Sequence, residues 1–424
     1  MCQSARDFLT AFVSCVAHIR DTVPIDFGPS AGKRHKRDKI TMNVLASLVC
    51  FLALATALFA QDSAGPVITV RKGTSQPVEV REIGGPAGSA ATSVLKNDIQ
   101  LSGSLSLAEA GAATVSLSGT ANEGSFNGIA TDRSGGVVLQ KAYSGDTRRA
   151  VHEFTNELVE TLTGQKGIAL SKVAFVADRT GHKEVYTCDY DGARTLQLTH
   201  DGAISVSPAL APDGRRLAYT GYQSGYADIY LVDLVTGARN RIIKYPGTNS
   251  GAAFSPDGNL IACTLSKDGN PEIYVTDLTG GSARRLTRGR GVESSPTWSP
   301  NGSEIIYSSD ERGGPQLFRI PVSGGLGRAL QTGFGYNTQP NWSPDGKRVT
   351  FNVRSGGFQI AILDLDSGAT RVAVSDGENP VWGPDSRHII FSRGNGLFLF
   401  DTVSGRETRL IGDLGQISEP TWSR

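Results

Sequence analysis

The sequence predicts a mainly β fold, with a six-bladed β-propeller in the C-terminal part and a small α+β domain in front of it. Two observations carry this prediction. Glycine supplies 51 of the 424 residues, about 12% against about 7% in average proteins, which favours many tight turns. A sequence motif also recurs every 40–44 residues along the C-terminal half, and this period is typical of a four-stranded propeller blade.

The recurring motif is Pro-x-(aromatic or Leu)-Ser-Pro-Asp-Gly, with small variations. Pro-Asp-Gly is typical of a tight turn, because Pro presets its own φ, Asp caps the turn and Gly accepts a positive φ. An apolar strand follows each turn, and a third strand alternates apolar residues, as in 229–233. The aromatic column has spacings of 44, 44, 44, 40 and 40: Leu210, Phe254, Trp298, Trp342, Trp382 and Trp422. We interpret the column as packing between blades rather than as a ligand cage.

The order of strands predicts how the ring closes. The first unit begins at its second strand, 172–177, and no inner strand precedes it. A spare inner strand, 419–423, lies at the C-terminus. Pairing these two strands completes the first blade and removes two exposed sheet edges. We therefore expect six blades over residues 166–424, closed by the C-terminal strand.

Residues 61–165 are expected to form the α+β domain. Its clearest element is a helix at 147–164, because apolar residues such as Phe154 and Leu158 recur at i, i+3, i+4 spacing and Gly164 ends the pattern. A second helix is expected at 91–99. Strands are expected at 67–70, 78–83, 113–118, 125–131 and 137–143.

Residues 1–60 have the features of a leader with a signal peptide. A basic stretch at 33–39 precedes an uncharged apolar run at 44–60, and the small residue Ala60 ends this run. This combination predicts secretion and cleavage near Ala60. The run is also at the short limit of a membrane span, so an uncleaved anchor is the alternative. Export predicts a soluble protein of the periplasm.

Charge and residue chemistry exclude several classes of function. The formal net charge of +1 does not suggest the basic surface of a nucleic-acid-binding protein. Cys188 and Cys263 lie in different predicted blades, and we expect two buried thiols rather than a disulfide. After the leader there is no zinc-protease His pair, nucleophile elbow or phosphate-binding loop. We predict no catalytic residue, no cofactor and no enzymatic activity.

Polar residues near the start of each inner strand are expected to ring one mouth of the channel. The repeat places the residues three and four positions before the aromatic column around one opening. The predicted partner-binding residues of this rim are Ser207, Asn249, Ser250, Glu293, Ser294, Thr338, Gln339, Glu378, Asn379 and Glu419. Because Glu293, Glu378 and Glu419 add carboxylates here, a Ca²⁺ ion in the channel is a further candidate, although no ligand set converges by spacing.

The repeats and the segment in front of them resemble the TolB family. The helix from Phe154 onward ends in Leu-Thr-Gly164-Gln-Lys-Gly167, and Lys172-Val-Ala-Phe and Asp189-Tyr-Asp-Gly192 follow it. This order is similar to the junction between the two TolB domains. The opening at 68–80 also looks like the strand-turn-strand of the family, whereas the family's usual Val-Pro-Phe reads Val80-Arg-Glu here.

The resemblance implies a non-enzymatic adaptor of the Tol–Pal envelope system. Such proteins bind the peptidoglycan-associated lipoprotein Pal through a mouth of the channel, and their N-terminal segment engages the inner-membrane protein TolA. The implied role is to support outer-membrane integrity and constriction during cell division, as a monomer. Two alternatives remain open. One is a relative of the gating propellers of prolyl-oligopeptidase-like and tricorn-like peptidases, and the other is a glycan-binding propeller.

Overall fold

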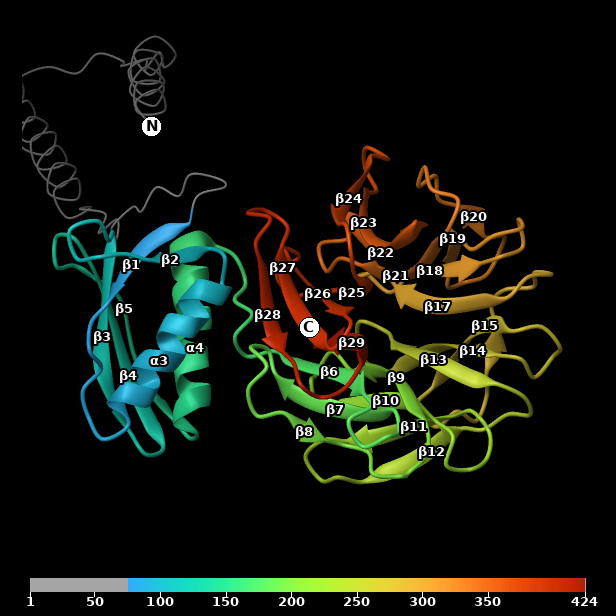
Figure 1. Cartoon of the computed structure of the whole chain (residues 1–424), viewed down its shortest axis with the longest axis horizontal. Helices are drawn as coiled ribbons and strands as arrows, with labels where there is room; N and C mark the ends of the chain where they lie inside the picture. Colours follow the sequence, from blue (N-terminus) through green and yellow to red (C-terminus); the bar gives the residue numbers. More distant parts are fainter. Residues whose placement is uncertain (1–74, 424) are drawn as a thin grey trace, which may run out of the picture. The chain divides into compact units, whose positions relative to one another are not determined.

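The computed structural model describes residues 75–423, which form one five-stranded sheet with two helices and then six four-stranded sheets (Figure 1). The mainly β fold with its six-bladed propeller is confirmed. The leader with its signal peptide at 44–60 and the strand expected at 67–70 lie outside the described residues. Between residues 75 and 423, no helix has the length and apolar character needed to cross a bilayer.

The α+β segment is built on a mixed sheet of order β2-β1-β3-β4-β5. Strand β1 pairs in parallel with β2 and with the central strand β3, and β3, β4 and β5 form an antiparallel meander. The three-residue strand β2 was not expected, because so short a segment carries no periodic pattern. The elements are β1 (Gln76–Val80), α3 (Gly88–Leu101), β2 (Leu105–Leu107), β3 (Val115–Asn122), β4 (Ser125–Asp132), β5 (Val137–Ser144) and α4 (Thr147–Thr163).

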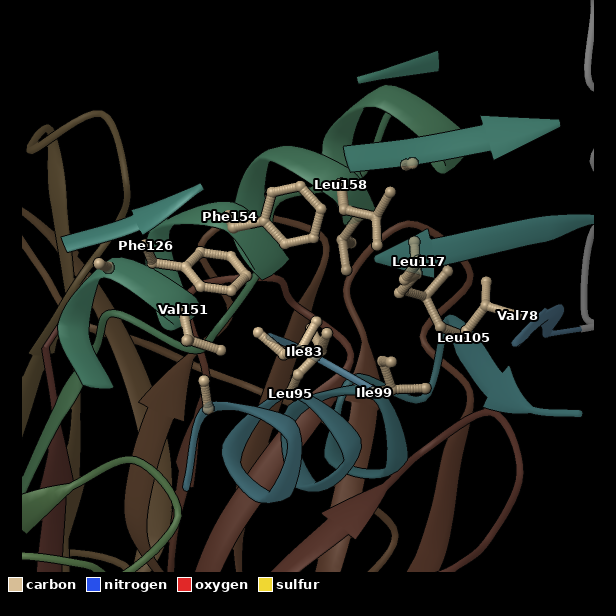
Figure 2. Close-up of a cluster of buried hydrophobic side chains, with 14 of the residues drawn as sticks. Val78, Ile83, Leu95, Ile99, Leu105, Leu117, Phe126, Val151, Phe154 and Leu158 are labelled. Atoms are coloured by element: carbon tan, nitrogen blue, oxygen red, sulfur yellow. The ribbon is translucent and has the colours of Figure 1, made fainter. Parts of the chain in front are cut away.

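The core of this segment lies between the sheet and the two helices (Figure 2). Helix α4 begins after Asp146, whose carboxylate accepts a hydrogen bond from the Arg149 N–H at 2.9 Å, and it ends at Gly164 with φ 67°. These are the capping residues that such helix ends favour. The face predicted from the spacing is buried, and Phe154 packs edge-on against Phe126 with 5.5 Å between ring centroids.

Six blades follow, each a four-stranded antiparallel sheet. Blade 1 contains β29 (Ile417–Trp422), β6 (Lys172–Ala177), β7 (Glu184–Asp189) and β8 (Leu196–Gln197). Blade 2 contains β9 (Ser205–Leu210), β10 (Arg216–Gly221), β11 (Asp228–Asp233) and β12 (Arg239–Ile243). Blade 3 contains β13 (Asn249–Phe254), β14 (Leu260–Leu265), β15 (Glu272–Asp277) and β16 (Arg284–Arg285).

The remaining blades repeat this plan. Blade 4 contains β17 (Glu293–Trp298), β18 (Glu304–Ser309), β19 (Gln316–Pro321) and β20 (Arg328–Ala329). Blade 5 contains β21 (Asn337–Trp342), β22 (Arg348–Ser355), β23 (Gly357–Asp364) and β24 (Thr370–Val374). Blade 6 contains β25 (Glu378–Trp382), β26 (His388–Arg393), β27 (Gly396–Asp401) and β28 (Glu407–Ile411).

The C-terminal strand closes the ring, as the strand order predicts. Strand β29 pairs antiparallel with β6, with Trp422 opposite Val173. Two further hydrogen bonds extend the pairing, because Lys172 N–H donates to Ser423 Oγ at 2.8 Å and Ser423 N–H donates to the Lys172 carbonyl at 2.9 Å. Figure 1 shows β29 (red) beside β6 (green), although the two strands come from opposite ends of the propeller sequence.

The hydrophobic core of the ring is divided into six clusters, one in each seam between neighbouring blades. The aromatic column contributes one residue to every seam, where it packs against the preceding blade. The four tryptophans of the column are only 2–4% exposed. Their burial supports packing between blades as the role of the column. Cys188 and Cys263 are also buried, and both are free thiols as expected.

A buried polar cluster joins the two helices to blade 1. Asp98 of α3, only 1% exposed, accepts hydrogen bonds from the Tyr190 hydroxyl at 2.7 Å and the Thr155 hydroxyl at 3.1 Å. His152 Nδ1 lies 2.8 Å from the same carboxylate. Burial, and then the charge of Asp98, raises the pKa of Tyr190 well above its ordinary value. The hydroxyl therefore stays protonated and remains a donor to Asp98.

Deletion of residues 418–424 is expected to abolish cooperative thermal unfolding of the ring. The deletion removes most of β29, leaves β6 without its partner and opens the cluster around Trp422. Differential scanning calorimetry of the full and shortened chains tests this expectation. An unchanged transition in the shortened chain contradicts the role of β29 in closure.

Trp422→Ala should lower the free energy of unfolding by about 3–5 kcal/mol, because it leaves a cavity in the same cluster. The control Leu326→Ala, at an 89% exposed site, should lower it by less than about 0.5 kcal/mol.

Tyr190→Phe is expected to lower the free energy of unfolding by about 1.5–3 kcal/mol, because it removes a hydrogen bond to a buried carboxylate. Tyr226→Phe is the matched control, since Tyr226 is 72% exposed and its change should stay within about 0.5 kcal/mol. Denaturant unfolding followed by tryptophan fluorescence measures both variants. Equal stability of the two variants means that the Tyr190–Asp98 bond contributes nothing.

Candidate functional site

Every inner strand carries one residue in the left-handed region of φ, at the same place in each repeat. This residue lies three positions before the aromatic column, and in five of the six blades a proline follows it. A β-bulge interrupts the pairing of each inner strand at this point. The residues and their φ values are Ser207 50°, Gly251 63°, Ser295 53°, Gln339 52°, Asn379 57° and Glu419 51°. We call these six residues the left-handed ring.

The prolines that follow the left-handed ring explain its position. Proline has no N–H to donate, so within a sheet it is confined to edge strands and bulges. The inner strands are edges, because none of the strands between residues 75 and 423 pairs with them on the channel side. A left-handed residue other than glycine costs about 1–3 kcal/mol, and such residues cluster at functional sites. Five of them around one opening therefore indicate a candidate binding site.

All six residues of the left-handed ring line one cavity of about 310 Å³ in the channel. The wall of the cavity is formed by the prolines that follow the ring and by members of the aromatic column, such as Trp298 and Trp382. The cavity therefore combines amide, hydroxyl and carboxylate groups with apolar ring faces. This is the composition typical of a binding pocket.

Hydrogen bonds connect the ring from blade to blade. The N–H of a ring residue donates to a side chain of the preceding blade in four of the six positions: Ser207 to Glu419 (2.6 Å), Gly251 to Thr220 (3.3 Å), Asn379 to Asn352 (3.1 Å) and Glu419 to Asn379 (3.2 Å). The Ser207 hydroxyl also donates to the Glu419 carboxylate at 3.2 Å. The left-handed backbone is thus stabilised by neighbouring blades, which orders the rim before any partner binds.

Four of the ten predicted rim residues line the cavity: Ser207, Gln339, Asn379 and Glu419. Another four lie one position earlier on the inner strands and do not line it: Ser250, Ser294, Thr338 and Glu378. The rim position predicted for Asn249 and Glu293 is wrong. These two residues are 0% and 1% exposed, because their backbone N–H groups bond to the preceding blade and hold the side chains inside the seams.

Sequence reasoning missed the residues of other strands that support the rim. Asn352 of β22 donates to the Gln339 side chain and accepts the Asn379 N–H. Its signal in the sequence is a polar residue between the buried apolar residues Phe351 and Val353. Thr421 of β29 accepts the Leu210 N–H at 3.2 Å, and Asn341 of β21 accepts the Trp382 N–H at 2.9 Å.

The three carboxylates considered for Ca²⁺ have separate surroundings. Glu419 accepts hydrogen bonds from Ser207, Glu293 is buried and accepts one from Ser309, and Glu378 is exposed. Between residues 75 and 423, no group of three or more His, Cys, Asp or Glu side chains is arranged to hold a metal ion. The channel of this structure therefore gives no support for a Ca²⁺ site.

Residues 159–424, more than half of the chain, match the family model of the TolB beta propeller domain. Similar curated proteins are the TolB homologs of Chlorobium luteolum (46% identical over 90 residues) and Chlorobaculum tepidum (44% over 96 residues). The Tol-Pal system protein TolB of Desulfosudis oleivorans is 40% identical over 90 residues. The matches cover 20–22% of this chain and 20–22% of each relative, so the chain spans about a fifth of their length.

Solved structures share the fold. The crystal structure of TolB from Acinetobacter baumannii matches 82% of this chain and 97% of that protein, with a TM-score of 0.74 and 23% identity. A chain of a nidogen/laminin complex also matches, over 60% of this chain and 98% of that chain, with a TM-score of 0.52 and 13% identity. Since the architecture is shared this widely, family membership depends on the sequence match. That match extends over the whole propeller, and the chain belongs to the TolB family.

Proposed function

We propose that this chain is a non-enzymatic adaptor of a Tol–Pal-type envelope system in the periplasm. In this proposal the channel cavity binds the peptidoglycan-associated lipoprotein, and the N-terminal segment binds an inner-membrane partner of the TolA type. Linking the two membranes supports outer-membrane integrity and constriction during cell division. The observation that carries the proposal is the left-handed ring, five of whose six members are not glycine.

The chemistry of the ring favours a polypeptide partner. Unpaired inner-strand edges present backbone polar groups to the channel, and the ring adds two hydroxyls, two amides and one carboxylate. Ala252, Phe254 and Val381 line the cavity and are only partly buried, so they provide apolar contact area, which anchors binding in many interfaces. A cavity of about 310 Å³ accommodates a few side chains. We therefore expect a protruding loop or helix end of the lipoprotein to enter the channel.

The lining of the cavity supports a non-enzymatic role. Among the described residues that line it, Glu419 is the only titratable side chain, and its carboxylate accepts hydrogen bonds from Ser207. The serine triads use an imidazole base that is oriented by an acid, and among the described residues the cavity lining contains no histidine. Acid–base catalysis on a substrate in the cavity would need a second titratable side chain beside Glu419, and the described lining offers none.

Gln339→Arg is expected to weaken binding of the lipid-free cognate lipoprotein at least about tenfold, which corresponds to about 1.4 kcal/mol. The larger charged side chain occupies the cavity and leaves an uncompensated charge in the interface. Gln165→Arg is the matched control, because Gln165 is exposed and does not line the cavity. Isothermal titration calorimetry measures both variants, and an unchanged Kd for Gln339→Arg contradicts binding at this rim.

A pull-down from an envelope extract tests the wider proposal. The expected capture is the peptidoglycan-associated lipoprotein, with less of it on the Gln339→Arg variant than on the Gln165→Arg variant. Recovery of a glycan or a processed peptide in its place overturns the adaptor role and favours one of the other two propeller classes.

A further inference from the structure

The first residue of several inner strands occupies an equivalent buried place in the seam between two blades. In four successive seams its N–H donates to a backbone carbonyl just before the third strand of the preceding blade, and Ser205 makes the first of these bonds, to Lys183 (2.8 Å). The other three residues have longer side chains, and their bonds are Asn249 to Ala227 (3.1 Å), Glu293 to Pro271 (3.0 Å) and Asn337 to Pro315 (2.8 Å). The three side chains therefore face the first residues of β11, β15 and β19, which are Asp228, Glu272 and Gln316.

In two of these seams the side chain at this place is a hydrogen-bond donor. The Asn249 amide donates to the Asp228 carboxylate at 3.3 Å, and the Asn337 amide donates to the Gln316 carbonyl oxygen at 2.8 Å. In the seam between blades 3 and 4, Glu293 replaces the asparagine and faces Glu272. Two carboxyl groups thus lie where the neighbouring seams pair an amide with an acceptor.

This carboxyl pair is enclosed. Glu272 and Glu293 are 0% and 1% exposed, and Oε2 of each is buried without a hydrogen-bond partner among the described residues. Each Oε1 has a donor, which is Arg285 for Glu272 and the Ser309 hydroxyl, at 2.9 Å, for Glu293. Gly289 packs so closely against the Glu293 carboxyl group that a Cβ at this position would overlap Glu293 Oε1.

We propose that Glu293 and Glu272 form a proton-dependent latch between blades 3 and 4, in which the protonated Glu293 carboxyl donates a hydrogen bond to Glu272. Two adjacent carboxylates that are both ionised are unfavourable in a buried site, and one proton shared between them removes the repulsion. The O–H of a protonated glutamic acid supplies the donor that the asparagine amide supplies in the neighbouring seams.

The surrounding charges favour the protonated form. Glu272 on β15 and Glu311 after β18 are both negative and act on Glu293, whereas the guanidinium of Arg285 on β16 is already paired with Glu272. Tyr307 on β18 also faces Glu293, and burial raises its pKa, so it remains neutral. Asp268 adds negative charge near Arg285, while Arg288 and Arg290 beside Gly289 are exposed to solvent. In agreement, burial, and then the charge of Glu272, raises the pKa of Glu293 to about 7.

The raised pKa determines the direction of the effect on stability. The unfolded carboxyl releases its proton near the ordinary pKa of 4.5, whereas the folded one retains it to about 7. The stabilisation by the latch is therefore complete below about pH 4.5 and is lost as the pH rises to about 7. Ser295 of the left-handed ring lies two residues after Glu293 and lines the cavity, so loss of the latch loosens the blade 4 side of the rim.

Thermal unfolding of the wild-type chain and of Glu293→Gln, from about pH 5 to about pH 8, tests the latch. Glutamine donates a hydrogen bond to Glu272 at every pH, so the Tm of the variant minus that of the wild type should rise with pH and become constant above about pH 7. Glu123→Gln is the matched control, because Glu123 is exposed and its difference from the wild type should not depend on pH over this range. Infrared difference spectra near pH 6 should contain a buried carboxylic-acid band that Glu293→Gln removes.

Three results would overturn the latch. The first is a constant Tm difference between Glu293→Gln and the wild type at all pH values, together with no carboxylic-acid band. The second is a rise in the wild-type Tm on addition of Ca²⁺ or Mg²⁺ at pH 7 that Glu293→Gln lacks, since the pair then holds a cation in place of the proton. If the variant does not fold, an NMR titration of the Glu293 side-chain carbon in the wild type measures the pKa of this carboxyl group directly and tests the latch. A midpoint near 7 supports the latch, and a midpoint near 4.5 is the third overturning result.

Discussion

Pairing of β29 with β6 is the interaction on which the rest of the structure depends. The propeller has no single core, because its six apolar clusters each lie between two neighbouring blades. Without β29, blade 1 lacks its inner strand and the cluster around Trp422 is open. The same pairing brings Glu419 to Ser207, residues 212 positions apart in the chain. Closure therefore creates both the last seam and the last contact of the rim.

The repeat creates structurally equivalent positions in the blades, and the residues at these positions have different roles. The left-handed ring faces the channel and is held by hydrogen bonds from neighbouring blades. Two residues earlier along the inner strand, the chain enters a buried seam. There an asparagine bridges two blades at Asn249 and Asn337, whereas Glu293 faces another carboxyl group. In the proposed latch, the change from asparagine to glutamate at this position makes a contact between blades sensitive to protons.

The channel is the common element of the proposed function and the proposed latch, but each can fail without the other. Binding at the ring depends on shape and polar complementarity around a cavity of about 310 Å³. The latch depends on two buried carboxyl groups that do not line this cavity. Gln339 lines the cavity and Glu293 does not, so the two proposals rest on different residues. Family membership and a shared fold do not by themselves specify either property.

The sequence alone determined the period, the turns, helix α4 and the closing strand, because these depend on local rules. Pro-Asp-Gly forms turns wherever it occurs, i, i+4 spacing marks the buried face around Phe154, and a missing first strand requires a spare one. Only the tertiary structure decided which polar residues reach the channel. The bulge at each Pro changes the register of the inner strand, so residues one or two positions apart point to different surroundings. Gln339 therefore lines the cavity while Glu293 is buried in a seam, and Asn352 reaches the rim from the neighbouring strand of the same blade, because the antiparallel pairing places it opposite Thr338.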